Sequence, residues 1–365
     1  MSETDLVLGI VVATALAFDF TNGFHDTANV VATSISTRAM SPRIAVGFAA
    51  VLNFAGAFLS LEVAATIAED VVDPLVITTT VIFAGLVGAI AWNLITWYFG
   101  LPSSSSHALI GGIVGATFVA AGADAVFGEG ILGKVLVPAV IAPVLAFFVG
   151  AVGIVVCYRV VGRQRPGPVT RGFRFGQVLS GGLLALAHGT NDAQKTMGVI
   201  ALALIASGHL GAGSDPPVWV IVSAATAIAL GTYTGGWRII KTMGTRIIKM
   251  DAAQGFSAQG AGAAVILAST HFGFPLSTTQ VIAGGVMGAG AGKRISAVRW
   301  GVAGNIVVAW LLTLPAAALF GALVYLVTDL FPVAVGPVVV AVLGLAAVAT
   351  VFARRIRTPA PAPSG

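Results

Sequence analysis

Two polar motifs interrupt long apolar runs of this chain, and each is a version of the other. The first spans residues 22–29 (Asn-Gly-Phe-His-Asp-Thr-Ala-Asn) and the second spans 188–195 (His-Gly-Thr-Asn-Asp-Ala-Gln-Lys). An ionisable side chain in the middle of a membrane-spanning segment costs roughly 2.5–3.5 kcal/mol on insertion scales, so such residues usually mark a pathway or a site. The two copies therefore predict one buried site that is built from two halves.

Composition places these runs in a membrane. Hydrophobic residues make up 57% of the chain and charged residues only 9%, whereas a soluble protein carries roughly 25% charged residues. The net charge of +5 does not indicate a nucleic-acid partner, because the Lys and Arg residues cluster in short stretches between apolar runs. Residues 1–5 are acidic and lack the basic start of a signal peptide, so we expect the first run to be retained. The chain is predicted to be a multi-pass membrane protein, in contact with lipid.

Apolar runs of a length that approaches or exceeds a membrane span recur along the chain. A span needs about 20 apolar residues. The fold class is therefore predicted to be an all-α polytopic membrane protein with about ten to twelve transmembrane helices, including short or re-entrant ones. The runs lie near residues 6–36, 43–67, 74–100, 101–120, 134–158, 175–207, 217–237, 252–273, 274–290, 299–326 and 333–353.

A second internal match supports duplication. Residues 102–115 align without a gap to 275–288 at a shift of 173, and the polar motifs repeat at a shift of 166. Basic and acidic loops alternate, which indicates an N-terminus outside and a C-terminus in the cytoplasm. Five crossings in each half then force the halves into opposite orientations, the signature of an inverted-repeat secondary transporter. The predicted organisation is a first repeat over 1–158, a basic cytoplasmic linker over 159–174, a second repeat over 175–326, and an extra transmembrane helix with a disordered Pro-rich tail over 327–365.

The two hydroxyl-rich segments of the second match predict an anion site. Pro-Ser-Ser-Ser-Ser (102–106) and Pro-Leu-Ser-Thr-Thr (275–279) each precede a short Gly-rich run, so each is expected to begin a short helix. A helix N-terminus offers unpaired N–H groups and a positive dipole end to an anion. Hydroxyls in membrane helices also bond backbone carbonyls, but the duplication favours a tetrahedral oxyanion between the two ends. The expected anion-binding residues are Ser104, Ser105, Ser106, Ser277, Thr278, Thr279, Asn191 and Thr27.

Two carboxylates beside an anion require compensating cations. Asp26, Asp192, Lys195 and a divalent anion sum to about three negative charges, too many for a low-dielectric site. Anion–cation symport is the simplest resolution, although a buried carboxylate can also cap a backbone and a lysine can reach the membrane interface. The expected cation- or proton-coupling residues are Asp26, Asp192, His25, Asn29, Lys195, Asn22 and Glu62. If sodium is the coupling ion, its expected ligands are Asp26, Asn29 and Asp192.

These motifs resemble those of the inorganic phosphate transporter (PiT) family, in particular its bacterial low-affinity branch. The resemblance covers residues 18–326 and rests on the doubled polar motif and the two hydroxyl segments. It implies a plasma-membrane symporter that takes up inorganic phosphate, in some members as a metal–phosphate complex, with protons or sodium as the coupling cation. It also implies a homodimer without a resident cofactor.

Two residues depart from the family pattern and bear on the coupling ion. Many sodium-coupled relatives carry Gly-x-Asn-Asp-x-x-Asn in both halves, whereas this chain has His25 before the first Asp and Lys195 at the end of the second motif. An ammonium near Asp192 can replace a bound sodium ion, and histidine changes its charge near neutral pH. We therefore expect proton coupling, with the His25–Asp26 pair as the proton carrier.

The alternatives are a sodium-coupled phosphate symporter, a sulfate permease of the same family and an anion channel. Phosphate can donate a hydrogen bond to a buried carboxylate and sulfate at neutral pH cannot, which favours phosphate. A membrane enzyme using His25 and Asp26 is disfavoured, because no nucleophile or metal cluster accompanies the pair and duplication has no role in such a site.

Overall fold

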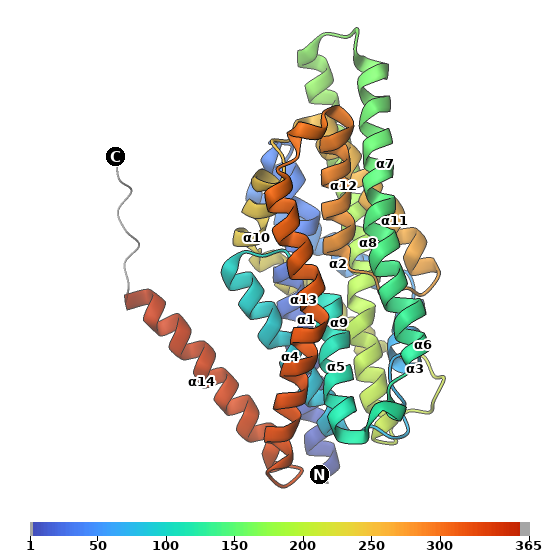
Figure 1. Cartoon of the computed structure of the whole chain (residues 1–365), viewed down its shortest axis with the longest axis vertical. Helices are drawn as coiled ribbons and strands as arrows, with labels where there is room; N and C mark the ends of the chain where they lie inside the picture. Colours follow the sequence, from blue (N-terminus) through green and yellow to red (C-terminus); the bar gives the residue numbers. More distant parts are fainter. Residues whose placement is uncertain (1–2, 358–365) are drawn as a thin grey trace.

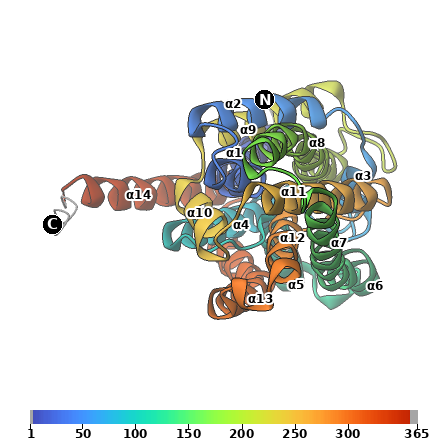
Figure 2. The ribbon, with the colours of Figure 1, turned by 90° about the horizontal axis from the view of Figure 1, so that it is seen from above.

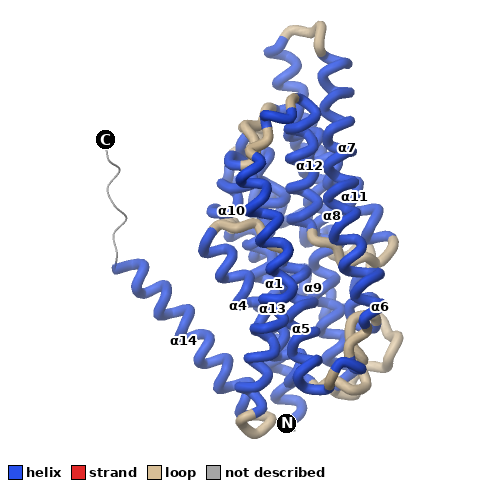
Figure 3. The backbone as a smooth tube through the Cα atoms, in the orientation of Figure 1, coloured by secondary structure: helices blue, strands red, loops and turns tan. Residues whose placement is uncertain are grey.

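The computed structural model describes residues 3–357 and consists of helices and connecting loops there, with two isolated β-bridges and no strands. Figure 3 shows the helical tube and its short loops. This architecture confirms the all-α fold class. The predicted disordered tail around residues 359–363 lies outside the described residues.

The helices follow the predicted runs closely. Their bounds in chain order are α1 Glu3–Ser36, α2 Pro42–Gly56, α3 Glu62–Glu69, α4 Thr79–Phe99, α5 Ser105–Ala121, α6 Gly128–Gly130, α7 Val137–Val161, α8 Pro166–Ala206, α9 Val218–Thr234, α10 Trp237–Lys241, α11 Ala252–His271, α12 Thr278–Lys293, α13 Trp300–Asp329 and α14 Val335–Arg357. A π-helical stretch over 131–136 joins α6 to α7, and another over 242–246 follows α10.

Several of these helices can cross a bilayer unaided. By length and hydropathy they are α1, α4, α13 and the continuous segment Gly128–Val161. Helix α9 and the segment Trp237–Arg246 pass the same test only together, and they are bent by 59° where they join. Helices α8 and α11 are long enough, but their polar residues lower their hydropathy, and they lie among other helices. The predicted total of ten to twelve also counts short helices such as α5 and α12, and that number stays a prediction.

Helices α5 and α12 pack in reciprocal surroundings. Helix α5 packs against α4 and α13, whereas α12 packs against α11 and α7, so each short helix contacts a long helix from the other half of the chain. The two isolated bridges, Val72 to Val126 and Ile248 to Val298, occur at matching points beside these helices. In Figure 1, α5 occupies the lower half of the bundle and α12 the upper half, and α1 and α8 begin at opposite ends.

Close glycine contacts hold the short helices against their long partners. A Cβ placed on Gly115 of α5 would lie 2.0 Å from the carbonyl oxygen of Ala318, and one on Gly288 of α12 would lie 1.9 Å from that of Phe147. Only glycine lets the backbones approach so closely. Gly115 and Gly288 are equivalent in the internal match, so both halves hold their short helix against a long helix by the same kind of close glycine contact.

Two predicted segments are divided differently in the structure. The run 43–67 is broken at residues 57–61 into α2 and the short α3, so it is not one continuous span. The basic stretch 159–174 is mostly helical, because α7 continues to Val161 and α8 starts at Pro166, a residue suited to the first turn of a helix. The connection is therefore only the turn at residues 162–165. Its Arg-rich helical flanks are the exposed ends of α7 and α8.

The C-terminal helix α14 leaves the bundle. Figures 1 and 2 show it diverging from α13 at a wide angle, with its far end away from the other helices. Its stretch Val335–Ala346 is apolar. The assignment of this region as an extra transmembrane helix stays a prediction.

The N-terminus of α11 carries a complete capping box outside the spans listed above. Asp251 accepts the backbone N–H of Gln254 at 2.9 Å, and the Gln254 side chain accepts the N–H of Asp251 at 3.0 Å. The Tyr158 hydroxyl (2.5 Å) and the Lys293 ammonium (2.9 Å) also donate to Asp251. Partial burial works to raise the pKa of Asp251, but the hydrogen bonds from Tyr158 and Lys293 outweigh it, and the pKa lies below its ordinary value.

Candidate functional site

The site forms where the N-termini of α5 and α12 meet inside the bundle. Ser104 is the N-cap of α5 and accepts the N–H of His107 at 3.1 Å, and Ser277 is the N-cap of α12 and accepts the N–H of Gln280 at 3.3 Å. The prediction that both hydroxyl segments begin short helices is confirmed. His107 and Gln280, equivalent residues of the two halves, lie 3.3 Å apart between Nδ1 and Nε2.

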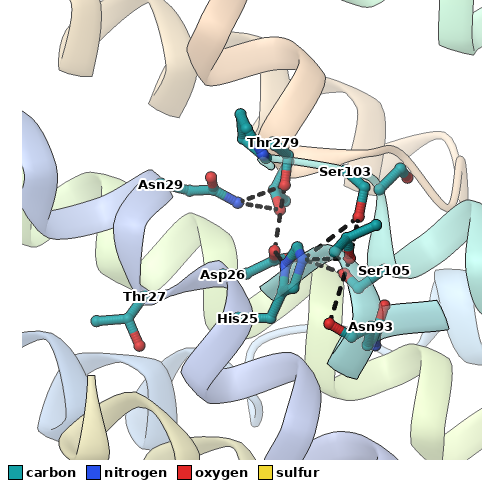
Figure 4. A network of polar contacts seen from close by, with 12 residues as sticks. His25, Asp26, Thr27, Asn29, Asn93, Ser103, Ser105 and Thr279 are labelled. Carbon is teal, nitrogen blue, oxygen red and sulfur yellow. Dashed lines mark hydrogen bonds and ion pairs between the residues drawn. The ribbon is translucent and has the colours of Figure 1, made fainter. Parts of the chain in front are cut away.

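The first carboxylate, Asp26 on α1, is surrounded by donors. Its Oδ2 accepts the Ser105 hydroxyl at 2.5 Å, and its Oδ1 accepts the Thr279 hydroxyl at 3.2 Å and lies 2.6 Å from Nδ1 of His25. The Asn29 amide donates to Thr279 at 2.9 Å. Figure 4 shows these side chains converging from α1, α5 and α12. One carboxylate thus links both short helices.

The second carboxylate, Asp192 on α8, is held in a parallel way. Its Oδ2 accepts the Thr278 hydroxyl at 3.1 Å and lies 3.0 Å from Nε2 of His188, while Oδ1 contacts the Lys195 ammonium. Asn53 lies 3.3 Å from the other ring nitrogen of His188. The adjacent hydroxyls of α12 therefore divide between the two motifs, with Thr278 on Asp192 and Thr279 on Asp26.

Lys195 sits in a cage of oxygen atoms. Its Nζ donates to the Ser106 hydroxyl at 2.6 Å and to the Leu276 carbonyl at 2.7 Å, in addition to Asp192. Ser106 in turn donates to the same carbonyl at 2.9 Å. A carboxylate, a hydroxyl and a carbonyl are the ligands that a hard cation takes, so the ammonium occupies a position suited to a monovalent metal ion.

The charged side chains of the cluster are buried, and their charges do not cancel. Asp26, Asp192, Lys195, His25 and His188 are each no more than 1% exposed. With both imidazoles neutral, two carboxylates and one ammonium leave one net negative charge before any anion enters. An anion can be bound here only if protons or metal ions enter with it.

A metal ion has a ready set of ligands in this cluster. Ligand atoms of Asp26, His188 and Asp192 all lie within 4.8 Å of one another. The sodium ligands expected from the sequence are Asp26, Asp192 and Asn29, so that prediction has Asn29 where this cluster has His188. In the structure the Asn29 amide nitrogen faces the α12 hydroxyls and its Oδ1 has no hydrogen-bond partner among the described residues.

Thr27 and Glu62 lie outside this cluster, and their predicted roles stay predictions. The Thr27 hydroxyl donates to the carbonyl oxygens of Gly23 (2.6 Å) and Thr232 (3.2 Å), and Figure 4 shows it pointing away from Asp26. Neighbouring helical residues project about 100° apart, so Thr27 cannot share the face of Asp26. Glu62 is the first residue of α3, directly after the break at residues 57–61, and its side chain is exposed.

Asn191 and Asn22 lie at the edges of the cluster. The Asn191 amide donates to the Thr270 hydroxyl at 2.8 Å and to the Phe274 carbonyl at 3.1 Å, so it positions the loop that leads into α12. Asn22 is buried on α1, and its Oδ1 has no partner among the described residues.

Two buried ionisable residues of this region were not assigned from sequence. His188 is the first residue of the second motif, and its place in the doubled motif could have identified it as a site residue. Asp19 is 0% exposed on α1, and the signal that could have found it is a carboxylate inside an apolar run. Asp19 has no counterpart in the second half, where Ala185 stands at the equivalent position, so a search for repeats passes over it.

Comparison with known proteins gives consistent matches. The model of the phosphate transporter family matches residues 22–321. The chain is similar to proteins named probable low-affinity inorganic phosphate transporter: 58% identical over 320 residues in Mycobacterium tuberculosis (87% of this chain, 77% of the relative) and 45% identical over 323 residues in Bacillus subtilis (88% and 97%). A solved structure titled "The sodium-dependent phosphate transporter" matches with a TM-score of 0.80 and 24% identity, over 89% of this chain and 100% of that one. At this identity the solved structure supports the fold alone.

Proposed function

This chain belongs to the phosphate transporter family, and we propose that it carries inorganic phosphate into the cell by symport with protons. The resemblance to that family and the assignment as a multi-pass membrane transporter rather than an enzyme are confirmed. The coupling ion, the metal requirement and the homodimer are not decided by family membership. The site geometry bears on the first two of these.

The observation that carries the proposal is the meeting of two helix N-termini between two carboxylates. Ser105 and Thr279 now donate to Asp26, and Thr278 donates to Asp192. Hydroxyls rotate, so the same groups can donate to the oxygens of an entering oxyanion, assisted by the positive dipole ends of α5 and α12. Protonated phosphate can donate a hydrogen bond to a carboxylate, and sulfate at neutral pH cannot, so the carboxylates favour phosphate.

Lys195 favours protons over sodium as the coupling ion. Its ammonium fills the oxygen cage of Asp192, Ser106 and Leu276, which would otherwise suit a sodium ion. A fixed positive charge in this position neutralises Asp192 throughout the cycle. Coupling then has to use a group that gains and loses a proton.

The His25–Asp26 pair supplies such a group within the doubled motif. Nδ1 of His25 lies 2.6 Å from Asp26, and Nε2 lies 3.2 Å from the Thr96 hydroxyl and 3.3 Å from that of Ser103. A proton on this imidazole would bring the second positive charge that the anion requires.

A second candidate substrate is a metal–phosphate complex. The proximity of Asp26, His188 and Asp192 favours it, because carboxylates with one imidazole can hold a divalent cation. In that case the metal is cargo that enters with phosphate, and its two charges offset those of the anion.

Alternating access would use the reciprocal packing of the fold. We propose that α5 with α13 and α12 with α7 act as equivalent units of two inverted repeats, which rock about the fixed site at the helix ends. Such a cycle moves substrate against its gradient, and an anion channel cannot.

The test is uptake of labelled phosphate into proteoliposomes under imposed gradients. We expect accumulation above equilibrium under an inward pH gradient without sodium, and little competition from sulfate compared with arsenate. The matched variants are Asp192→Asn, which should abolish uptake, and Asp124→Asn, which changes an exposed carboxylate and should not. Accumulation driven by sodium alone at constant pH would contradict proton coupling, and near-complete block by sulfate would contradict the substrate. A requirement for Mg²⁺ or Mn²⁺ would favour the metal–phosphate complex.

A further inference from the structure

One buried carboxyl group, Asp19, plays no part in the site described above. It lies on α1, it is 0% exposed, and neither of its oxygens accepts a well-formed hydrogen bond from a described residue. Thr196 on α8 and Asn22 on α1 are the polar side chains beside it. The Thr196 hydroxyl and Oδ1 of Asn22 are themselves buried and without partners among the described residues. Three neighbouring polar side chains are thus unsatisfied together.

A proton on Asp19 satisfies this group. An ionised carboxylate only accepts hydrogen bonds, so it offers nothing to Oδ1 of Asn22, and an unpaired buried charge is strongly disfavoured. A protonated carboxyl gains an O–H that can donate to Asn22, while its second oxygen can accept from the Thr196 hydroxyl. The geometry therefore favours the neutral acid at Asp19 in this conformation.

The two motif carboxylates have the opposite surroundings. Asp26 is within reach of Ser105, Thr279 and His25, and Asp192 contacts Thr278, His188 and the Lys195 ammonium. Each can remain ionised without a proton of its own. Asp19 has only Thr196 and Asn22 as polar neighbours, and neither forms a well-formed hydrogen bond with its carboxyl oxygens.

The charged groups that act on Asp19 come from α8. They are the carboxylate of Asp192 and the ammonium of Lys195. Helices α4 and α9, which also pack against α1, carry only Tyr98 and Tyr233 as ionisable side chains. Any change in the charge near Asp192 therefore changes the electrostatic energy of a charge on Asp19.

The position of Asp19 connects it to the anion site. Asp19, Asn22, Asp26 and Asn29 follow one another at helical spacing along one face of α1. Asp26 lies seven positions after Asp19 along α1, a rise of about 10 Å. Asp19 is close enough to the site to influence it and far enough away to exchange its proton separately.

We propose that Asp19 is a second proton-carrying site, outside the doubled motif, whose protonation is linked to phosphate binding. The inference rests on the proposed function. An ionised Asp19 would add a negative charge to a region that already holds two carboxylates and receives an anion, so phosphate binding and proton binding favour each other. This linkage is reciprocal: phosphate promotes protonation of Asp19 on the entry side, and release of phosphate promotes its loss on the other.

Asp19→Asn tests the proposal because the amide mimics the neutral acid and cannot release a proton. The variant should still exchange internal for external labelled phosphate in proteoliposomes. Under an inward gradient of one pH unit, net accumulation should fall about tenfold relative to wild type, the factor carried by one proton. The control Asp124→Asn should match wild type in both assays, and Asp19→Glu, which keeps a titratable carboxyl, should recover part of the accumulation.

Two results overturn the proposal: accumulation in Asp19→Asn at the wild-type level, or loss of exchange in correctly inserted Asp19→Asn protein. If Asp19→Asn fails to insert, infrared spectroscopy decides. A protonated-carboxyl band must then shift between wild type and Asp19→Glu, and an unchanged band overturns the assignment. Failure of the proposed function is distinct, since wild type itself would then show neither phosphate exchange nor pH-driven accumulation.

Discussion

Replacing Lys195 by asparagine should make the protein respond to sodium. The substitution removes the ammonium from the cage of Asp192, Ser106 and Leu276 and introduces the residue found at the equivalent position, Asn29, of the first motif. Breaking a buried ion pair by removing one partner costs about 3–5 kcal/mol, because the other charge is left without compensation. Asp192 keeps His188 and Thr278, so we expect the lower end of this range.

Sodium can restore part of this loss. The cage without the ammonium keeps a carboxylate, a hydroxyl and a carbonyl as ligands, and the introduced amide adds another oxygen. A ligand that binds only the folded state at one hundred times its Kd adds about 2.7 kcal/mol of stability. We therefore expect NaCl to recover most of the loss in Lys195→Asn and to leave wild type unchanged.

The assay is the free energy of unfolding in detergent, compared in NaCl and in choline chloride at equal ionic strength and pH. The matched control is Lys134→Asn, which removes an exposed ammonium 3.8 Å from Asp70. Such surface pairs contribute about 1 kcal/mol or less. Sodium-specific stabilisation of wild type, or a loss in Lys195→Asn no larger than in Lys134→Asn, would refute the assignment of Lys195 as a replacement for sodium.

Three further predictions concern other parts of the chain. Gly23→Ala should destabilise the protein by about 1–3 kcal/mol, since its Cβ would lie 2.4 Å from the carbonyl oxygen of Ile228, whereas Gly9→Ala, with nothing within 4 Å, should be neutral in the same unfolding assay. Thr27→Val should lower stability by about 1 kcal/mol and leave the KM for phosphate unchanged; a large rise in KM would return Thr27 to the binding site. The lowered pKa of Asp251 contributes stability that is present above its unfolded pKa of about 3.9 and is lost as the pH falls through the folded value. Stability in detergent should therefore decline in acid, less steeply in Asp251→Asn, and equal slopes would show that this carboxylate does not contribute.

Local patterns were sufficient for the helix starts. A proline followed by hydroxyl residues and a Gly-rich run is a short-range signal, and the caps formed by Ser104 and Ser277 lie where that signal puts them. The doubled motif likewise identified Asp26 and Asp192 as buried partners of the same site, because the cost of burying a carboxylate does not depend on the details of the fold.

Side-chain direction could not be predicted from the sequence. The Thr27 hydroxyl donates to backbone carbonyls of Gly23 and Thr232 and does not contact Asp26. The break at residues 57–61 leaves Glu62 exposed at the start of α3. Asp19 was not identified from the sequence because it stands outside the repeat. Only its surroundings in the structure show that its carboxyl oxygens lack hydrogen-bond partners among the described residues.

The sequence by itself determined the membrane environment, the duplication and the residues too costly to bury without a function, since these follow from transfer energies and internal similarity. The tertiary structure decided which of these residues meet. Thr278 and Thr279 are adjacent in sequence, yet they divide between Asp192 and Asp26, and the oxygen cage of Lys195 draws on α5, α8 and the segment before α12. Such contacts depend on how helices from the two halves cross, and the chain sets those crossings only through packing over its whole length.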